Sequence, residues 1–332
     1  MKKLSVIVFL TVMVLLQVAH FNVQGQTVTN RYSMKLNQNE DGTYSLKNKK
    51  MYEDILDMET IEDLTTPYTY QPNKLTADLY SNTRTEIRTY KSYESYDLKL
   101  AIDKAETDSP APVMFFCHGG GWSRGSFKSG KTLARYLAQQ YGITCVRISY
   151  TLANQPGAKI EVSIEDVMDA VKYISENAES LNVDPERIGF YGSSAGAHLS
   201  ACAAMKCKET KVFVGNAGVY DLTVADAVVN TKSEIRKAYF RQLDPEVLRA
   251  ASPINMIPKK KKIAVQLYHG TGDITVKCAQ SKLFAEKLKK ANRKSVVELV
   301  IYENYGHNLN NTTSDKMEEI FFKTAQFIAQ NL

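Results

Sequence analysis

Residues 188–205 read IGFYGSSAGAHLSACAAM, and this stretch decides the fold. The apolar run from Ile188 to Tyr191 has the composition of a buried strand, and the residues from Ala195 to Met205 resemble a helix. Between them lies the pattern Gly-x-Ser-x-Gly, with Ser194 at its centre. Glycines flank a turn of this kind because other side chains would collide there. The stretch therefore predicts a strand, a strained turn and a helix, with the Ser194 hydroxyl raised above the edge of a sheet.

Strands alternate with helices on both sides of this turn. Six short apolar runs read as buried strands, namely residues 113–117, 143–149, 188–191, 212–216, 263–269 and 296–302. Helix-length segments separate them, namely residues 129–141, 163–181, 195–205, 276–292 and a longer insert at 222–257. Two earlier runs, residues 85–90 and 96–102, alternate with period two. The order predicts an α/β fold, with a mostly parallel doubly wound sheet, two leading antiparallel strands and a small helical cap insert.

A second motif, His118-Gly119-Gly120-Gly121-Trp122, follows the strand at 113–117. Functional loops of such sheets lie at the carboxyl ends of the strands, so this loop should meet the Ser194 turn. Consecutive glycines leave backbone N–H groups uncovered. We expect the N–H groups of Gly120, Gly121 and Ala195 to form an oxyanion hole, which stabilises the oxygen that becomes negative during acyl transfer.

A serine hydroxyl is a weak nucleophile without a general base. His307 follows the last predicted strand, and Asp273 follows the strand before it, which is the chain order Ser, Asp, His of a known triad arrangement. We predict that Ser194 is the nucleophile, His307 its base and Asp273 the acid that orients the base. Asp221 and Glu303 are alternatives for the acid.

These motifs together resemble the hormone-sensitive-lipase-like and acetyl-esterase branches of the α/β-hydrolase family. The resemblance runs from about Tyr90 to the C-terminus and rests on six stretches, namely residues 118–122, 147–150, 183–188, 192–196, 269–273 and 306–307. It implies the α/β-hydrolase fold and hydrolysis of carboxylic esters by a Ser-His-Asp triad without a cofactor. Ser193 stands where many relatives carry aspartate, and Ser149-Tyr150-Thr151-Leu152 replaces a common Asp-Tyr-Arg-Leu stretch. Both differences favour the secreted bacterial esterases that resemble feruloyl and acetyl-xylan esterases.

Substrate choice should depend on the elements that roof the strand ends. We expect Trp122, Tyr150 and the 222–257 insert to contact the substrate. The insert is short, which favours short acyl groups on a small-molecule or polysaccharide-linked ester. Two other functions are compatible with the same fold: a non-catalytic binding protein and a serine peptidase.

The N-terminus has the pattern of a secretory signal over residues 1–25, with Lys2 and Lys3 before an apolar run from Leu4 to Val18. That run has 15 residues, fewer than the roughly 18 to 20 of a membrane span, so no stable membrane anchor is expected. This predicts a secreted or periplasmic protein. Residues 26–84 read as a polar leader with one amphipathic helix at 51–64, and residues 85–332 as the catalytic domain.

Composition excludes several classes of protein. The net charge of +6 is dispersed among 42 basic and 36 acidic residues, so no nucleic-acid partner is expected. Five cysteines are too few for a disulfide scaffold, and four of them read as small buried residues: Cys117, Cys145, Cys202 and Cys207. No group of cysteines and histidines has the spacing of metal ligands, so no metal is expected.

Overall fold

The computed structural model describes residues 36–41, 43–46, 85–224, 233–291, 293–309 and 314–332. The predicted signal at 1–25 and the predicted amphipathic helix at 51–64 lie outside these ranges. Within these ranges, no helix combines the length and the apolar character that a membrane crossing requires.

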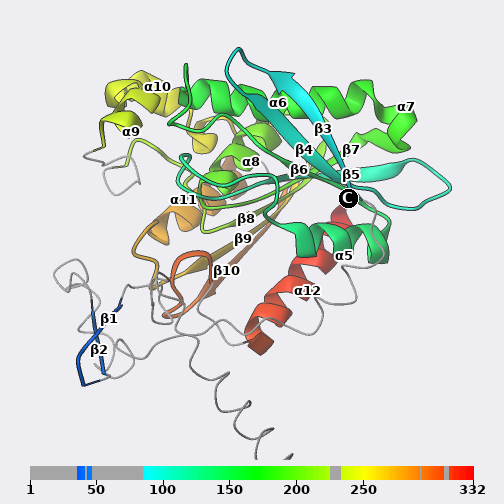
Figure 1. The fold of residues 1–332 in the computed structure, drawn as a ribbon. Helices are drawn as coiled ribbons and strands as arrows, with labels where there is room; N and C mark the ends of the chain where they lie inside the picture. The colour runs from blue at the N-terminus through cyan, green and yellow to red at the C-terminus, as the bar shows by residue number, and fades with distance from the viewer. Residues whose placement is uncertain (1–35, 42, 47–84, 225–232, 292, 310–313) are drawn as a thin grey trace, which may run out of the picture.

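An eight-stranded sheet forms the centre of the molecule, in the order β10-β9-β8-β7-β5-β6-β4-β3 (Figure 1). Its strands are β3 (Thr85–Ser92), β4 (Asp97–Asp103), β5 (Ala111–Cys117), β6 (Thr144–Ile148), β7 (Val183–Ser193), β8 (Thr210–Asn216), β9 (Ala264–Gly270) and β10 (Val296–Tyr302). Strand β4 pairs antiparallel with β3 and with β6, whereas every other neighbouring pair is parallel. The predicted α/β sheet with two leading antiparallel strands is therefore confirmed.

Helices cover both faces of this sheet (Figure 1). Helices α5 (Lys131–Tyr141) and α12 (Ser314–Asn331) lie on one face, and α6 (Ile160–Glu176), α8 (Ala195–Lys206) and α11 (Ala279–Ala291) lie on the other. Alternate residues of a strand point to opposite faces, so Phe115 enters the core beneath α8 while Met114 and Phe116 enter the core beneath α5. All four cysteines expected to be buried are at most 4% exposed.

Two helical segments differ from expectation. The segment at 163–181 is two helices, α6 and α7 (Ala178–Leu181), separated at Asn177, whose side chain donates to the Tyr173 carbonyl at 2.8 Å. Such a bond competes with the helical backbone and ends α6. Helix α12 is absent from the expectations, although its buried residues Ile320, Thr324 and Phe327 recur at helical spacing.

Part of the predicted polar leader has regular structure. Strands β1 (Leu36–Gln38) and β2 (Tyr44–Leu46) pair antiparallel. The Asp41 carboxylate accepts hydrogen bonds from the Thr43 backbone N–H at 3.0 Å and from the Thr43 hydroxyl at 2.6 Å. An aspartate that bonds its own backbone two residues on stabilises a tight turn, which explains this hairpin within a polar segment.

The described part of the cap insert is made of short helices: α9 (Glu234–Tyr239), η3 (Arg241–Leu243), α10 (Pro245–Ala250) and η4 (Pro253–Asn255). The Tyr239 hydroxyl donates to Ser163 Oγ of α6 at 2.7 Å, and the Phe240 ring meets Trp122 edge to face at 5.2 Å. These contacts join the insert to α6 and to the loop that follows β5.

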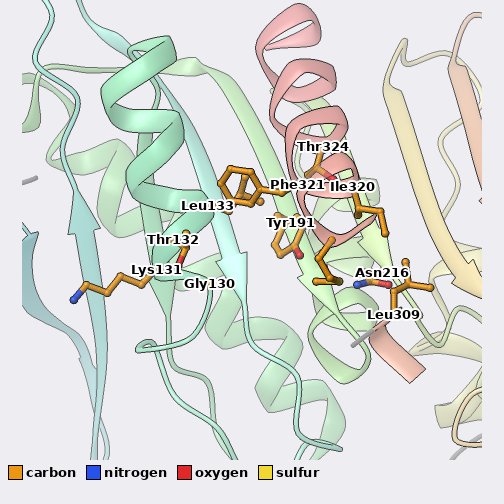
Figure 2. A pocket seen from close by; sticks show the side chains of 11 residues that line it. Gly130, Lys131, Thr132, Leu133, Tyr191, Asn216, Leu309, Ile320, Phe321 and Thr324 are labelled. Carbon is orange, nitrogen blue, oxygen red and sulfur yellow. The ribbon is translucent and has the colours of Figure 1, made fainter. Parts of the chain in front are cut away.

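A cavity of about 240 Å³ lies between α5, α12 and the ends of β7 and β8 (Figure 2). Apolar side chains such as Leu133, Ile320 and Phe321 line most of it, and Lys131 points away from it. Ser194 and His307 are not among its lining residues, so it is distinct from the site described below.

Candidate active site

Ser194 lies on a strained turn between β7 and α8. Its backbone has φ 56° and ψ −124°, a conformation that side-chain-bearing residues rarely adopt. A Cβ atom on Gly196 would approach the Cys117 carbonyl oxygen to 2.1 Å, and one on Gly192 would approach the Gly196 carbonyl oxygen to 2.3 Å. The turn therefore admits only glycine at both flanks, as the Gly-x-Ser-x-Gly pattern predicts, and it directs the Ser194 side chain to the carboxyl edge of the sheet.

The structure brings together the three residues predicted as a triad. His307 Nε2 lies 2.9 Å from Ser194 Oγ, although 113 residues separate them in the sequence. His307 Nδ1 lies 2.7 Å from Asp273 Oδ2. Because an ionised carboxylate can only accept, Nδ1 carries the hydrogen and Nε2 is left to receive the serine proton. This is the geometry that general-base activation of a serine requires.

The Asp273 carboxylate is 2% exposed and accepts four hydrogen bonds. Oδ1 accepts the backbone N–H groups of Thr275 and Val276, and Oδ2 accepts His307 Nδ1 and His269 Nε2. Burial opposes the charged form, but the bonds from His269 and His307 outweigh it and lower the pKa of Asp273 from 3.8 to about 2. Asp273 is therefore ionised at neutral pH, and its contribution to stability is lost only as the pH falls from 3.8 towards 2.

The two alternative acids lie elsewhere. The Asp221 carboxylate accepts the backbone N–H and the hydroxyl of Thr223, at 2.9 and 2.6 Å. Glu303 is exposed. The described hydrogen bonds of the His307 ring go to Asp273 and Ser194 alone, so the geometry favours Asp273.

The glycine loop after β5 passes directly over the Ser194 turn. A Cβ atom on Gly119 would lie 2.9 Å from the Ser193 carbonyl oxygen and 3.5 Å from Ser194 Cβ. Gly120 has φ 122°, a backbone conformation that glycine adopts without strain. Ala195 is the first residue of α8, where backbone N–H groups lack an acceptor within the helix. The loop and the helix start thus lie beside Ser194, and the oxyanion hole of Gly120, Gly121 and Ala195 stays a prediction.

Trp122 and Tyr150, the residues predicted to contact substrate, lie in the interior, and each is 1% exposed. The Tyr150 ring stacks on His118 at 4.3 Å, and its hydroxyl donates to the His118 carbonyl at 2.8 Å. The sequence showed both residues in loops at the strand ends, but the loops fold so that both side chains point inward. We correct their assignment. Tyr150 packs against His118 at the start of the glycine loop, and Trp122 fixes the end of that loop through its contacts with His198 and Phe240.

His198 is buried one turn into α8 and links the glycine loop to the cap. Its Nε2 donates to the Ala251 carbonyl at 2.9 Å, and its Nδ1 accepts the Trp122 indole N–H at 3.4 Å. Burial lowers the pKa of His198 to about 4, so the ring is neutral at physiological pH and suits this pair of bonds.

His269 is a site residue that the sequence did not single out. Its Nε2 lies 2.8 Å from the Val276 carbonyl and 3.1 Å from Asp273 Oδ2, and both of these atoms can only accept. Nε2 therefore carries the hydrogen, while Nδ1 accepts from the Ser281 hydroxyl at 2.7 Å. The stretch His269-Gly270-Thr271-Gly272-Asp273 was the only sequence feature that pointed to this contact. Sequence alone did not show that the His269 side chain turns back towards the Asp273 carboxylate.

Replacing His269 by phenylalanine should lower kcat by about 10- to 100-fold with little change in KM, because Asp273 would lose a donor that fixes its position. His269→Gln should restore part of the rate, since its amide can donate to the same oxygen. Steady-state kinetics on a p-nitrophenyl ester would measure both. Equal losses in the two variants, or a loss confined to KM, would exclude this positioning role.

Comparison with known proteins places this geometry in a family. The model of the BD-FAE family matches residues 98–288, more than half of the chain. Isoprenylcysteine alpha-carbonyl methylesterase ICME of Arabidopsis thaliana is 26% identical over 226 residues, 61% of this chain and 52% of that protein. A probable isoprenylcysteine alpha-carbonyl methylesterase of Oryza sativa subsp. japonica is 29% identical over 219 residues, 60% of this chain and 52% of that protein. The chain spans about half the length of these curated relatives.

Solved structures agree on the fold. The apo form of Thermogutta terrifontis esterase 2 has a TM-score of 0.62 and 26% identity, covering 75% of this chain and 96% of that one. Its propionate-bound form has a TM-score of 0.62 and 24% identity, covering 79% of this chain and 97% of that one. The sheet order, the structural likeness and the family match lead to one conclusion: the chain belongs to the BD-FAE family, a feruloyl-esterase-like group of α/β-hydrolases.

Proposed function

We propose that this protein is an exported serine esterase that hydrolyses short-acyl carboxylic esters through an acyl-enzyme. The observation that carries the proposal is the continuous set of contacts from Ser194 Oγ through the His307 ring to Asp273 Oδ2, at 2.9 and 2.7 Å. The relatives named methylesterases and the neighbour named an esterase support an ester as the bond that is cleaved. Export rests on the signal pattern of residues 1–25.

In the proposed reaction, Ser194 Oγ attacks the ester carbonyl carbon while His307 Nε2 takes the serine proton. The carbonyl oxygen becomes negative and accepts the N–H groups of Gly120, Gly121 and Ala195. The imidazolium, which Asp273 stabilises, then gives its proton to the departing alcohol oxygen, and Ser194 keeps the acyl group. A water molecule that loses its proton to His307 attacks the acyl-enzyme, the bond from the acyl carbon to Ser194 Oγ breaks, and Oγ takes the proton back from His307 as the acid leaves.

The size of the cap supports short acyl groups. Helices α9 and α10 have six residues each, fewer than two turns, so the described part of the insert gives little apolar surface to a long chain. The small cap favours acetyl groups on polysaccharides as the natural substrates that we propose. Feruloyl groups, which are larger but flat and rigid, are the alternative in line with the feruloyl-esterase-like family.

We expect the purified protein to hydrolyse p-nitrophenyl acetate and butyrate with kcat/KM at least about tenfold above that for octanoate, because a small cap leaves the longer chain in water. Release of p-nitrophenolate measures the three rates. 4-Nitroacetanilide, the amide matched to the acetate, is the control and should react far more slowly. A preference for octanoate would contradict the short-acyl assignment, faster amide cleavage would indicate a peptidase, and no cleavage of any ester would contradict the esterase.

A further inference from the structure

The turn that ends the glycine loop has a strained backbone. The Gly120 carbonyl accepts the Ser123 backbone N–H at 3.2 Å, which closes a four-residue turn. Its two central residues, Gly121 and Trp122, have φ values of 60° and 57°. Positive φ at both central positions is the arrangement of a type I′ turn, in which glycine, asparagine and aspartate predominate. A tryptophan there is strained, and it keeps that conformation only where its surroundings hold it.

Contacts of Trp122 with three other segments hold this conformation. The indole N–H donates to His198 Nδ1 at 3.4 Å, and the indole and imidazole rings meet edge to face at 5.5 Å. The Trp122 carbonyl accepts the Ala153 backbone N–H at 2.7 Å, and the Phe240 ring meets the indole edge to face at 5.2 Å. A hydrogen bond depends on direction more strongly than ring packing does, so the bond to His198 fixes the orientation of the indole.

His198 is itself fixed relative to Ser194. Its backbone N–H donates to the Ser194 carbonyl at 3.1 Å, in the first turn of α8. Its ring is buried, and Nε2 donates to the Ala251 carbonyl at 2.9 Å. Nδ1 therefore has a defined position beside the helix that begins after Ser194. The bond from Trp122 to Nδ1 ties the end of the glycine loop to that helix.

The turn also sets the direction of one predicted oxyanion donor. In a trans peptide group the C=O and N–H bonds lie in one plane and point in opposite directions. The peptide between Gly120 and Gly121 is trans, and its carbonyl points into the turn towards the Ser123 N–H. The Gly121 N–H therefore points out of the turn. If Trp122 left its positive φ, the turn would open and the Gly121 N–H would lose its fixed direction.

We propose that His198 is a positioning residue for the oxyanion hole, which acts through the Trp122 indole to keep the Gly121 N–H in place. The inference rests on the proposed esterase function and adds to it a residue outside the triad. Packing alone does not explain a histidine at this position, because burial of an imidazole costs free energy that a phenyl ring of similar size would avoid. A donor that is held in place before the reaction stabilises the developing oxyanion without reorganisation.

The test compares His198→Phe with His198→Gln on p-nitrophenyl acetate. Phenylalanine keeps a ring in place but removes both hydrogen bonds, so kcat should fall about 10- to 100-fold while KM changes little. The glutamine amide can accept from the indole through its oxygen and donate to Ala251 through its nitrogen, so it should restore part of the rate. Cys202→Ala is the matched control and should keep most of the activity, since Cys202 donates to the same Ala251 carbonyl at 3.4 Å from one turn farther along α8.

Intrinsic fluorescence measures the contact directly, because Trp122 is the one tryptophan of the chain. An indole that stays buried emits at a shorter wavelength than the same indole in the unfolded chain. His198→Phe should keep the short-wavelength emission, which shows that it folds, and should change its intensity because the imidazole beside the indole is gone. Cys202→Ala should keep the emission close to that of the native protein.

Trp122→Phe removes the other partner of the bond, so its loss of kcat should resemble that of His198→Phe, and it keeps the test decisive if His198→Phe does not fold. The double variant should lose no more than the worse single variant, because both changes interrupt one contact. A kcat for either single variant within about twofold of the native value, an equal loss in Cys202→Ala, or losses that multiply in the double variant would overturn the proposal. If the native protein hydrolyses no ester, the esterase function fails instead.

Discussion

Replacing Ser194 by alanine should lower turnover of every ester substrate by about 10⁴-fold or more, because the acyl-enzyme can no longer form. The hydroxyl makes one described hydrogen bond, to His307 Nε2, at the carboxyl edge of the sheet. Its loss should therefore change the free energy of unfolding by no more than about 1 kcal/mol. Steady-state kinetics and urea unfolding on the same preparation measure the two quantities.

Ser193→Ala is the matched control, since it alters the neighbouring residue of the same turn and should retain most of the activity. A fluorophosphonate probe gives an independent result: the native protein and Ser193→Ala should each gain one adduct in intact-mass spectra, and Ser194→Ala none. Retained activity in Ser194→Ala would refute the nucleophile. An unlabelled native protein without esterase activity would support a non-catalytic binding protein.

Replacing Asp103 by alanine should destabilise the fold by about 3 to 5 kcal/mol, because it leaves buried guanidinium groups without their counter-ion. Asp103, at the end of β4, is fully buried and contacts Arg147 Nε at 2.6 Å and Arg135 Nε at 3.5 Å. It also accepts the Thr85 hydroxyl at 2.6 Å, so the carboxylate joins β3, β4, β6 and α5. Urea unfolding followed by circular dichroism measures the loss.

Asp97 lies at the other end of the same strand and is exposed, which makes Asp97→Ala a matched control. Its cost should stay within about 0.5 kcal/mol, as for most surface substitutions. Similar costs for the two variants would show that the buried ion network contributes little to stability.

The sequence predicted the sheet well because its strands are short apolar runs separated by helices of ordinary length. The residues 296–302 predicted as the last strand agree with β10 as observed. Helix α12 was not predicted, because the polar residue Thr324 interrupts its buried face between Ile320 and Phe327 and weakens the apolar period. The hairpin of β1 and β2 was missed because its strands have three residues each, too few for a period to be read.

The triad was predictable because each member follows a strand, and parallel strands end at one edge of the sheet. Side-chain direction within loops was not predictable. Trp122 and Tyr150 lie in the loops expected to hold substrate. Their side chains nevertheless point inward, because their rings pack in the apolar core beneath α6 and α8. The contact of His269 with Asp273 was not predictable for the same reason, because it requires the chain to fold back over four residues so that the two side chains meet.

The position of β10 determines at which stage of folding His307 can reach Ser194. This strand lies at one edge of the sheet and pairs with β9 alone, with Tyr302 opposite Gly270. The nucleophile and the acid come from strands deeper in the sheet, but His307 is delivered only by the loop after β10. On the proposed mechanism, a chain that folds from its N-terminus onward therefore leaves Ser194 without its base until β10 has paired with β9. We expect hydrolysis to begin only after that step.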